Sequence, residues 1–119
     1  MGEETGVVIA PMPQSSRDVI IRTESLAEAE RFYSAVLGFA VSSRGVGIVG
    51  FETGSFCLYV EKGSEHGPVF EVLVADVQTT KARLIAAGCT LIDEDSSVPR
   101  CYVRDPYGVT FNIGKSPGP

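Results

Sequence analysis

The strongest constraint on the fold of this chain is an internal duplication, in which one order of predicted elements occurs twice. In the first half, residues 18–23 (DVIIRT) form a β-branched run that predicts a strand. A helical pattern over 26–37 follows, with Ser25 and Glu28 at the spacing of a capping box and Gly38 where a helix ends. Three more extended stretches complete this half, at 39–43, 47–53 and 55–62.

The second half repeats this β-α-β-β-β order about fifty residues later. Residues 68–75 predict a strand, and Asp76 is placed to cap a helix over 77–87 that ends at Gly88. The turn 105–108 (DPYG) joins the last two of three further strands, at 89–94, 100–104 and 109–113. One half alone would leave a sheet face exposed, so we expect the two halves to pair.

Each predicted helix carries an apolar stripe at helical spacing. The first stripe is Leu26, Ala29, Phe32, Tyr33, Val36 and Leu37, and the second is Val77, Ala82, Leu84 and Ile85. We expect both stripes to pack against the sheet.

At 119 residues the chain has the length of one domain. We expect a flexible arm over 1–16, a domain over 17–115 and a tail over 116–119. Within the domain, the first module spans about 17–62 and the second about 67–115. The predicted fold class is α+β.

Composition and charge argue against several kinds of partner. A net charge of −5 with ten scattered basic residues opposes a nucleic-acid surface, which needs clustered Lys and Arg. No apolar run approaches the roughly 20 residues that span a membrane, and the acidic N-terminus lacks the basic region of a secretory signal. Cys57, Cys89 and Cys101 form neither an even set nor a C-x-x-C pair, so we expect reduced, buried thiols in a cytoplasmic protein.

Three local sequences, in this order along the chain, resemble the vicinal oxygen chelate superfamily, which includes glyoxalases, bleomycin-resistance proteins and extradiol dioxygenases. They are AERFYSAVLGF after the first strand, ADVQTTKARLIAAG, and the ending RDPYGVTFNI. The match runs from about Arg17 to Lys115. The resemblance implies two modules whose sheets form an open cup. It also implies a homodimer, in which cups are often built from modules of both subunits.

The resemblance further implies where metal-using members place their ligands, on the first and last strands of each module. Those positions carry Asp18, Tyr59, Val69 and Asn112, of which only Asp18 is a common ligand. We therefore expect no metal or other cofactor, as in the bleomycin-resistance branch. The alternative is a divalent metal at an atypical site formed by Asp18, Glu71 and the only histidine, His66.

Alternation along the strands assigns side chains to the cup or to the helices. Val19, Ile21, Phe70, Val72 and Val74 are expected to face the helices, and Asp18, Ile20, Arg22, Val69, Glu71 and Leu73 the cup. The candidate ligand-binding residues are Asp18, Arg22, Tyr59, Glu71, Tyr102 and Asn112. Arg22 could bind a ligand carboxylate or phosphate in bidentate fashion, or it could pair with Glu71 or Asp18.

Two motif-like features are set aside. Gly45, Gly47 and Gly50 spell G-x-G-x-x-G, but a strand pattern follows where a dinucleotide site needs a helix, so a hairpin is expected. The single histidine has no sequence-suggested partner for a catalytic triad, and Asp105 is interpreted as a turn residue.

Two functions follow from these observations. The first is a metal-free protein that binds a small apolar or aromatic molecule in a cup at a dimer interface, with drug sequestration or resistance as one such role. The second is a lyase, isomerase or dioxygenase that uses the atypical metal site, or Asp18 or Glu71 as a base with a pKa raised by burial. Fold resemblance does not choose between them.

Overall fold

The computed structural model describes residues 12–117 and contains the predicted elements in the predicted order. The first module consists of β1 (Gln14–Thr23), α1 (Leu26–Arg31), the π-helical turn η1 (Phe32–Val36), β2 (Ala40–Gly45), β3 (Ile48–Glu52) and β4 (Cys57–Lys62). The second consists of β5 (His66–Val74), α2 (Val77–Ala86), β6 (Thr90–Asp95), β7 (Arg100–Arg104) and β8 (Thr110–Lys115). The α+β class and the duplicated order are confirmed.

The ends of the chain differ in part from the expected arm and tail. β1 begins at Gln14, so residues 14–16 belong to a strand and not to the arm. Gln14 and Ser15 pair with Leu73 and Val72 of β5, which gives this segment backbone partners. The rest of the predicted arm up to residue 11, and residues 118–119 of the predicted tail, lie outside the described residues.

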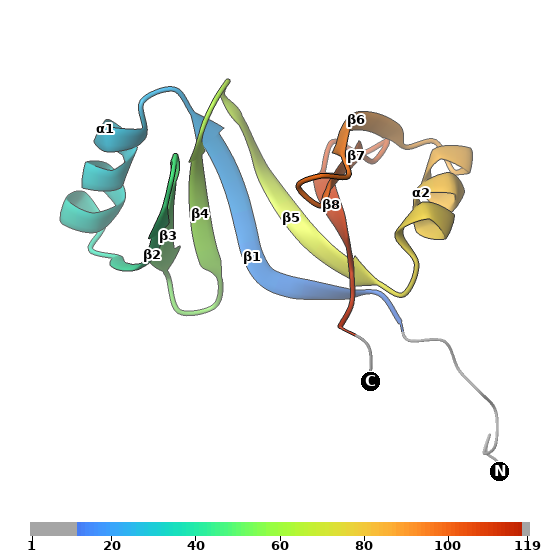
Figure 1. The fold of residues 1–119 in the computed structure, drawn as a ribbon, viewed down its shortest axis with the longest axis horizontal. Coiled ribbons are helices and arrows are strands. Elements are labelled where there is room, and N and C mark those ends of the chain that lie inside the picture. Colours follow the sequence, from blue (N-terminus) through green and yellow to red (C-terminus); the bar gives the residue numbers. More distant parts are fainter. Residues whose placement is uncertain (1–11, 118–119) are drawn as a thin grey trace, which may run out of the picture.

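All eight strands form one continuous mixed sheet in the order β2-β3-β4-β1-β5-β8-β7-β6. Within each module the first strand runs parallel to the last, and the modules meet where β1 pairs antiparallel with β5. Figure 1 shows α1 and α2 at opposite ends of the molecule, with β1 and β5 side by side between them. The two modules are therefore joined edge to edge, and the described chain is 54 Å long and about 30 Å across.

The described residues form two small cores and no core shared by the modules. Val49, Phe51, Leu58 and Val60 form the first, and Val74, Cys101, Val103 and Ile113 form the second. Each core lies beneath the helix of its own module. The radius of gyration is 16.7 Å, whereas a compact domain of this length has about 13.5 Å. The concave space between the cores is consequently left open for a site.

The predicted faces of β1 and β5 agree with these cores. Val19 and Ile21 pack against the first core, and Val72 packs against the second. Phe70 lies opposite Val19 in the antiparallel ladder and so shares its face. It belongs to neither core, however, and is 42% exposed because it lies at the junction of the modules.

The helix starts differ from each other, and one prediction is wrong. The Asp76 side chain accepts a hydrogen bond from the Thr79 backbone N–H at 3.0 Å, as expected for an N-cap. The Ser25 side chain makes no capping bond; its backbone N–H instead donates to Thr23 Oγ1 at 3.1 Å. Ser25 has φ −104° and ψ 60°, whereas Asp76 has the extended backbone that capping requires.

The predicted helical stripes are only partly buried. Leu26, Ala29 and Tyr33 contact the first core, and Val77 and Leu84 contact the second. The other large members are 44–69% exposed, and these are Phe32, Val36, Leu37 and Ile85. In the first module the regular helix ends at Arg31, so the residues after it follow the wider spacing of a π-helical turn.

The cysteines, the helices and the glycine-rich sequence bear on three further expectations. All three thiols are free, but only Cys101 is buried, and Cys57 and Cys89 are partly exposed. Neither helix in the described part of the chain is long and apolar enough to cross a membrane. The three glycines of the G-x-G-x-x-G sequence lie in or beside the β2–β3 hairpin, as expected.

Candidate functional site in the cup

A cavity of about 220 Å³ opens on the concave face between the two modules. Five of the six predicted ligand-binding residues line it together, namely Asp18, Tyr59, Glu71, Tyr102 and Asn112. The remaining lining residues are Ile20, Ile48, Glu61, Val98, Pro99 and Arg100. The sixth predicted residue, Arg22, lies at the rim, where its guanidinium carbon is 5.6 Å from the centre of the Tyr102 ring.

The ladder registers show which cup positions correspond between the modules. Asp18 pairs with Cys57 and Val69 pairs with Thr110, and these partners lie two residues before Tyr59 and Asn112 on the last strands. Asp18 therefore corresponds to Val69, as the sequence mapping has it, and Ile20 corresponds to Glu71. Of the two β5 residues only Glu71 lines the cavity, whereas Val69 is 1% exposed and lies outside its lining.

Tyr59 of β4 lines the cavity together with the carboxylates of Asp18 and Glu71. Burial raises the pKa of its phenol, and the charges of Asp18, Cys57 and Glu71 raise that pKa further. Gly50 lies opposite Tyr59 on β3, and a Cβ there would approach Tyr59 Cε1 to 2.8 Å. The glycine thus makes room for the ring, and the raised pKa keeps the hydroxyl protonated at neutral pH.

Asn112 fixes the other side of the cavity floor. Its Oδ1 accepts a hydrogen bond from the Cys101 backbone N–H at 2.8 Å, and its Nδ2 donates to Glu71 Oε2 at 3.3 Å. Asn112 is 6% exposed. Gly114 leaves space for the carboxylate, because a Cβ at that position would lie 3.1 Å from Glu71 Oε2. The amide therefore orients Glu71 and presents an NH₂ group to the cavity.

This donor set does not fit a divalent metal centre, which needs about three oxygen, nitrogen or sulfur ligands. The Asn112 oxygen is occupied by a backbone N–H, and the Tyr59 phenol remains protonated. Asp18 and Glu71 are left on the cavity floor, because the third carboxylate of the lining, Glu61, pairs with Arg22 and Arg100 at the rim. No group of three His, Cys, Asp or Glu side chains is close enough to hold a metal ion within residues 12–117, so His66 does not complete the alternative trio.

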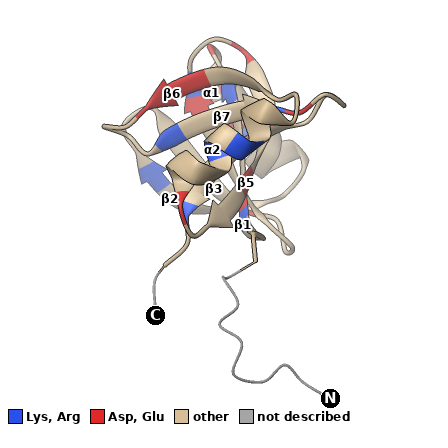
Figure 2. Ribbon diagram, turned by 90° about the vertical axis from the view of Figure 1, so that its right-hand side faces the viewer, with Lys and Arg blue, Asp and Glu red and all other residues tan. Residues whose placement is uncertain are grey.

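Above the cavity floor, four charged side chains form what we call the rim cluster: Arg22 of β1, Glu61 of β4, Asp93 of β6 and Arg100 of β7. Figure 2 shows acidic segments on β6 beside basic segments on β7. Both guanidinium groups lie over the Tyr102 ring, at 5.6 and 5.5 Å from its centre. The rim cluster thus links the first module to the second across the cup.

The partners of Arg22 differ from those predicted. Its guanidinium is 4.0 Å from Glu61 and 3.8 Å from Asp93, and it forms no ion pair with Asp18 or Glu71 among the described contacts. Glu61 lies directly opposite Arg22 in the β1–β4 ladder, and Asp93 approaches from the other module. The predicted partners lie on the cavity floor instead.

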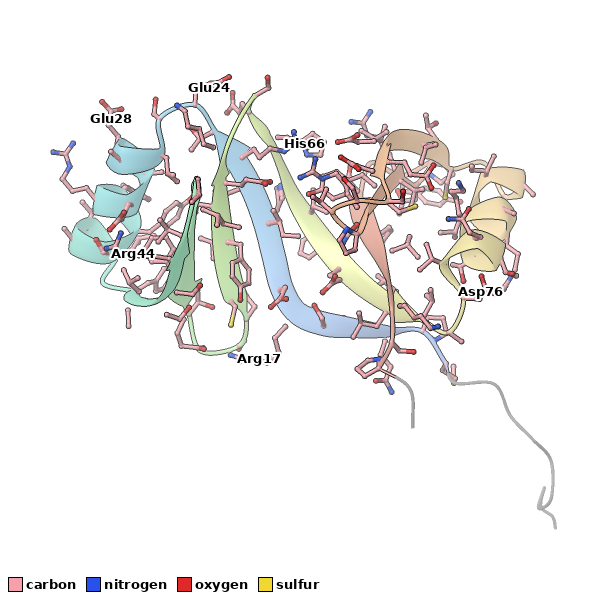
Figure 3. All side chains as sticks on the ribbon, in the orientation of Figure 1. Arg17, Glu24, Glu28, Arg44, His66 and Asp76 are labelled. Carbon is pink, nitrogen blue, oxygen red and sulfur yellow. The ribbon has the colours of Figure 1, made fainter. Side chains whose placement is uncertain are left out.

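His66 belongs to a strand and is partly buried. It begins β5, and its ring stacks on Tyr102 with 5.7 Å between the ring centres and an interplanar angle of 10°. Figure 3 shows the labelled His66 near the upper end of β5, between the modules. Burial and the nearby charges of Arg22 and Arg104 lower its pKa, so the imidazole is neutral at neutral pH.

Sequence reasoning missed Glu61, Asp93 and Arg100. The alternation of side chains along a strand could have identified two of them, because Glu61 follows Tyr59 by two residues and Arg100 precedes Tyr102 by two, which places each pair on one face. Asp93 needed the β6–β7 register, which places it opposite Tyr102. That register includes an irregularity between Leu91 and Asp93, which strict alternation does not predict.

The duplicated modules around one concave site define a member of the glyoxalase/bleomycin-resistance/dioxygenase superfamily. A model of the glyoxalase-like domain family matches residues 18–114, and the chain belongs to that family. No curated protein matches the chain.

Solved structures share this fold. One is a glyoxalase/bleomycin resistance protein/dioxygenase superfamily member from Vibrio splendidus, with TM-score 0.62 and 18% identity, over 87% of this chain and 100% of that one. Another is homoprotocatechuate 2,3-dioxygenase from Brevibacterium fuscum in complex with 3,4-dihydroxyphenylacetate, with TM-score 0.59 and 22% identity. That match covers 92% of this chain but only 39% of the dioxygenase, and a variant of the enzyme matches at TM-score 0.60 over 34% of its length. At these identities the likeness concerns the fold alone.

Proposed function

We propose that this protein binds a small aromatic molecule carrying a positively charged nitrogen, in the cup and without a metal ion. The observation that carries the proposal is the pairing of Asp18 and Glu71 in one cavity with the rings of Tyr59 and Tyr102. Within residues 12–117 neither carboxylate forms an ion pair with a basic side chain. A cationic ligand group would supply the missing partner.

The rest of the cavity suits the uncharged part of such a ligand. Ile20, Ile48 and Val98 provide apolar walls, and the ring of Tyr59 can attract both an aromatic ring and a cation. A net charge of −5 favours the approach of a cation. Sequestration of an aromatic, nitrogen-containing drug is one role of this kind.

The small volume supports a cup completed by a second copy of the chain. Ligand pockets commonly measure about 300–1,000 Å³, and this one measures about 220 Å³ in a single chain. Several large apolar side chains are exposed, including Phe32, Val36, Leu37 and Phe70. Sedimentation equilibrium should therefore give a dimer mass; a monomer mass at micromolar concentration would oppose this part of the proposal.

Lyase, isomerase or dioxygenase activity is the alternative. It receives less support, because the donor set on the cavity floor contains two carboxylates and does not fit a three-ligand metal site. The dioxygenases among the similar structures share the fold at 22–23% identity, and this likeness carries no substrate across.

A calorimetric titration with a matched pair of probes tests the proposal. Phenethylamine carries an ammonium group, and 2-phenylethanol replaces it with a neutral hydroxyl. We expect the amine to bind about tenfold or more tightly, since hydrogen bonds to charged groups contribute about 1.5–3 kcal/mol. Equal affinity for the two probes would contradict the proposal.

Matched variants locate the preference in the cup. Asp18→Asn and Glu71→Gln should each reduce the preference for the amine while leaving 2-phenylethanol binding nearly unchanged. Glu94→Gln is the control, because Glu94 pairs with Lys81 of α2 at 2.8 Å, outside the cavity lining. An amine preference that survives both cup variants would place the cation elsewhere.

A further inference from the structure

The ion pairs of the rim cluster are longer than the other ion pairs among residues 12–117. Its four N–O separations are 3.4, 3.5, 3.8 and 4.0 Å. The pairs Arg17–Glu52 and Lys81–Glu94 measure 2.7 and 2.8 Å, within the usual range of charge-assisted hydrogen bonds. The two guanidinium groups in the cup therefore have carboxylates nearby but are not tightly bonded to them.

Arg22 shows this incomplete bonding most clearly. Its Nε is buried and is the one buried side-chain nitrogen or oxygen without a hydrogen-bond partner in the described part of the chain. A buried donor without an acceptor is costly, because it has lost its water and gained nothing in return. An additional acceptor between the modules would remove that cost.

We propose that the rim cluster is the binding site for a carboxylate group of the ligand. This proposal rests on the proposed function and narrows the ligand class to aromatic zwitterions, with ammonium and carboxylate groups on one small aromatic molecule. Arg100 lines the same cavity as Asp18 and Glu71. A single ligand can therefore place its carboxylate at Arg100 and its ammonium group at the two carboxylates. Tyr102, with a guanidinium group over its ring from each module, lies between them.

Glu61 and Asp93 can make way for this carboxylate. Their side chains are 30% and 38% exposed, so they can turn toward water when the ligand replaces them. The side chains of Arg22 and Arg100 are less exposed, at 20% and 23%, and remain in the cup. A planar carboxylate matches the forked donors of arginine. With Glu61 and Asp93 turned toward water, Arg22 and Arg100 balance the charges of Asp18 and Glu71, and a zwitterionic ligand adds no net charge.

Four probes separate the two charged ends of such a ligand. Phenylalanine has both charges, phenylalaninamide only the ammonium, 3-phenylpropionate only the carboxylate, and 3-phenylpropanamide neither. Titrations in slightly acidic buffer keep the ammonium groups protonated. We expect phenylalanine to bind about tenfold more tightly than phenylalaninamide, from the strength of charge-assisted hydrogen bonds.

Substitution at the rim should remove this carboxylate preference alone. Arg100→Gln should bring phenylalanine and phenylalaninamide to equal affinity while the preference for ammonium over its neutral counterpart persists. Arg44→Gln is the control, because Arg44 pairs with Glu30 of α1 and both lie outside the cavity lining (Figure 3). If Arg100→Gln fails to fold, Arg22→Lys decides, since it keeps the charge but loses the fork and should reduce the same ratio.

The outcomes distinguish this proposal from the one on which it rests. Equal binding of phenylalanine and phenylalaninamide by the unaltered protein would overturn the carboxylate site and leave the rim cluster as a link between modules. Loss of the ammonium preference alone would overturn the proposed function instead. A carboxylate preference that survives both Arg100→Gln and Arg22→Lys would also overturn the rim site.

Discussion

The two modules are alike on the outer face of the sheet and differ on the cup face. On the outer face, apolar residues pair at equivalent positions: Val19 with Leu58 and Ile21 with Val60 in the first module, and Phe70 with Phe111 and Val72 with Ile113 in the second. In the cup, Asp18 corresponds to Val69, Ile20 to Glu71, and Tyr59 to Asn112. Packing against a helix constrains the outer face, whereas the cup tolerates divergence that creates an asymmetric site.

The modules also differ in what stabilises them. The first core contains Phe51, which lies 5.6 Å from Tyr33 between ring centres, whereas the second is built around the smaller Val103. The second module has a capped helix of ten residues, and the first has a six-residue helix without a side-chain cap. The first module thus depends more on aromatic packing, and the second more on local helix stability.

The largest predicted effect tests this difference in packing. Phe51 and Val103 are both 0% exposed. We expect Phe51→Ala to lower the free energy of unfolding by about 3–5 kcal/mol and Val103→Ala by about 2 kcal/mol, because the larger side chain leaves the larger cavity. Urea denaturation measures both values.

The same experiment tests whether the modules unfold together. β1 and β5 share an antiparallel ladder, so each module completes the sheet of the other. We expect one transition for both variants. Two separate transitions in Phe51→Ala would indicate that the cores are independent in stability as well as in position.

The second prediction concerns the equivalent cup positions. Asn112→Ala leaves the buried Cys101 N–H without its acceptor and Glu71 without a donor, which should cost about 1–3 kcal/mol of stability. Tyr59→Phe should change stability by less than about 0.5 kcal/mol, because the hydroxyl makes no hydrogen bond to the described residues. Equal losses in thermal unfolding would mean that the two positions have the same structural role.

Much of the fold could be predicted from the sequence, because the signals involved are local. Alternation placed Val19 and Ile21 on the helix side, and the residues that line the cavity include Asp18 and Glu71. The Ser25 cap was wrong because a capping-box spacing does not determine the backbone angles before the helix, and Thr23 bonds the Ser25 N–H first. Local sequence does not resolve that competition.

The parts of the site that could not be predicted depend on contacts across the cup. Asp93 reaches Arg22 from the opposite module, and the two are separated by most of the domain in sequence. His66 of β5 stacks on Tyr102 of β7 although β8 lies between these strands in the sheet, and the sequence of neither strand shows that contact. Alternation also placed both Val69 and Glu71 on the cup face, but only Glu71 lines the cavity, and Val69 is buried beside it in the sheet.

The third prediction compares the helix starts. Asp76→Ala should lower the urea midpoint clearly, because it removes the acceptor for the Thr79 N–H, whereas Ser25→Ala should leave it unchanged within error. Circular dichroism during denaturation measures both. Equal midpoints for the two variants would show that the Asp76 cap does not contribute to stability.

The Asp76 effect should depend on pH. Hydrogen bonds from the Thr79 backbone hold the pKa of Asp76 below its usual value. A depressed pKa means that the stabilisation is present above the ordinary carboxyl pKa, about 4, and is lost as the pH falls through the folded-state value. The midpoint difference between Asp76→Ala and the unaltered protein should therefore shrink in acid, and a difference that persists would contradict the assignment.

The smallest expected effect distinguishes Tyr59 from its counterpart Asn112 by titration. Burial, together with Asp18, Cys57 and Glu71, raises the pKa of Tyr59 above the ordinary tyrosine value. A raised pKa contributes stability that is fully present below the ordinary value, about 10, and is lost as the pH rises through the folded-state value. The stability difference between the unaltered protein and Tyr59→Phe should thus be constant to about pH 10 and change only above it. Tyrosinate absorbance, compared between the unaltered protein and Tyr59→Phe, measures the same group directly: Tyr59 should ionise late, and Asp18→Asn should make it ionise earlier by removing a negative charge. If Asp18→Asn leaves that titration unchanged, the carboxylate does not act on the Tyr59 hydroxyl, and the two-carboxylate floor on which the cation site depends is wrong.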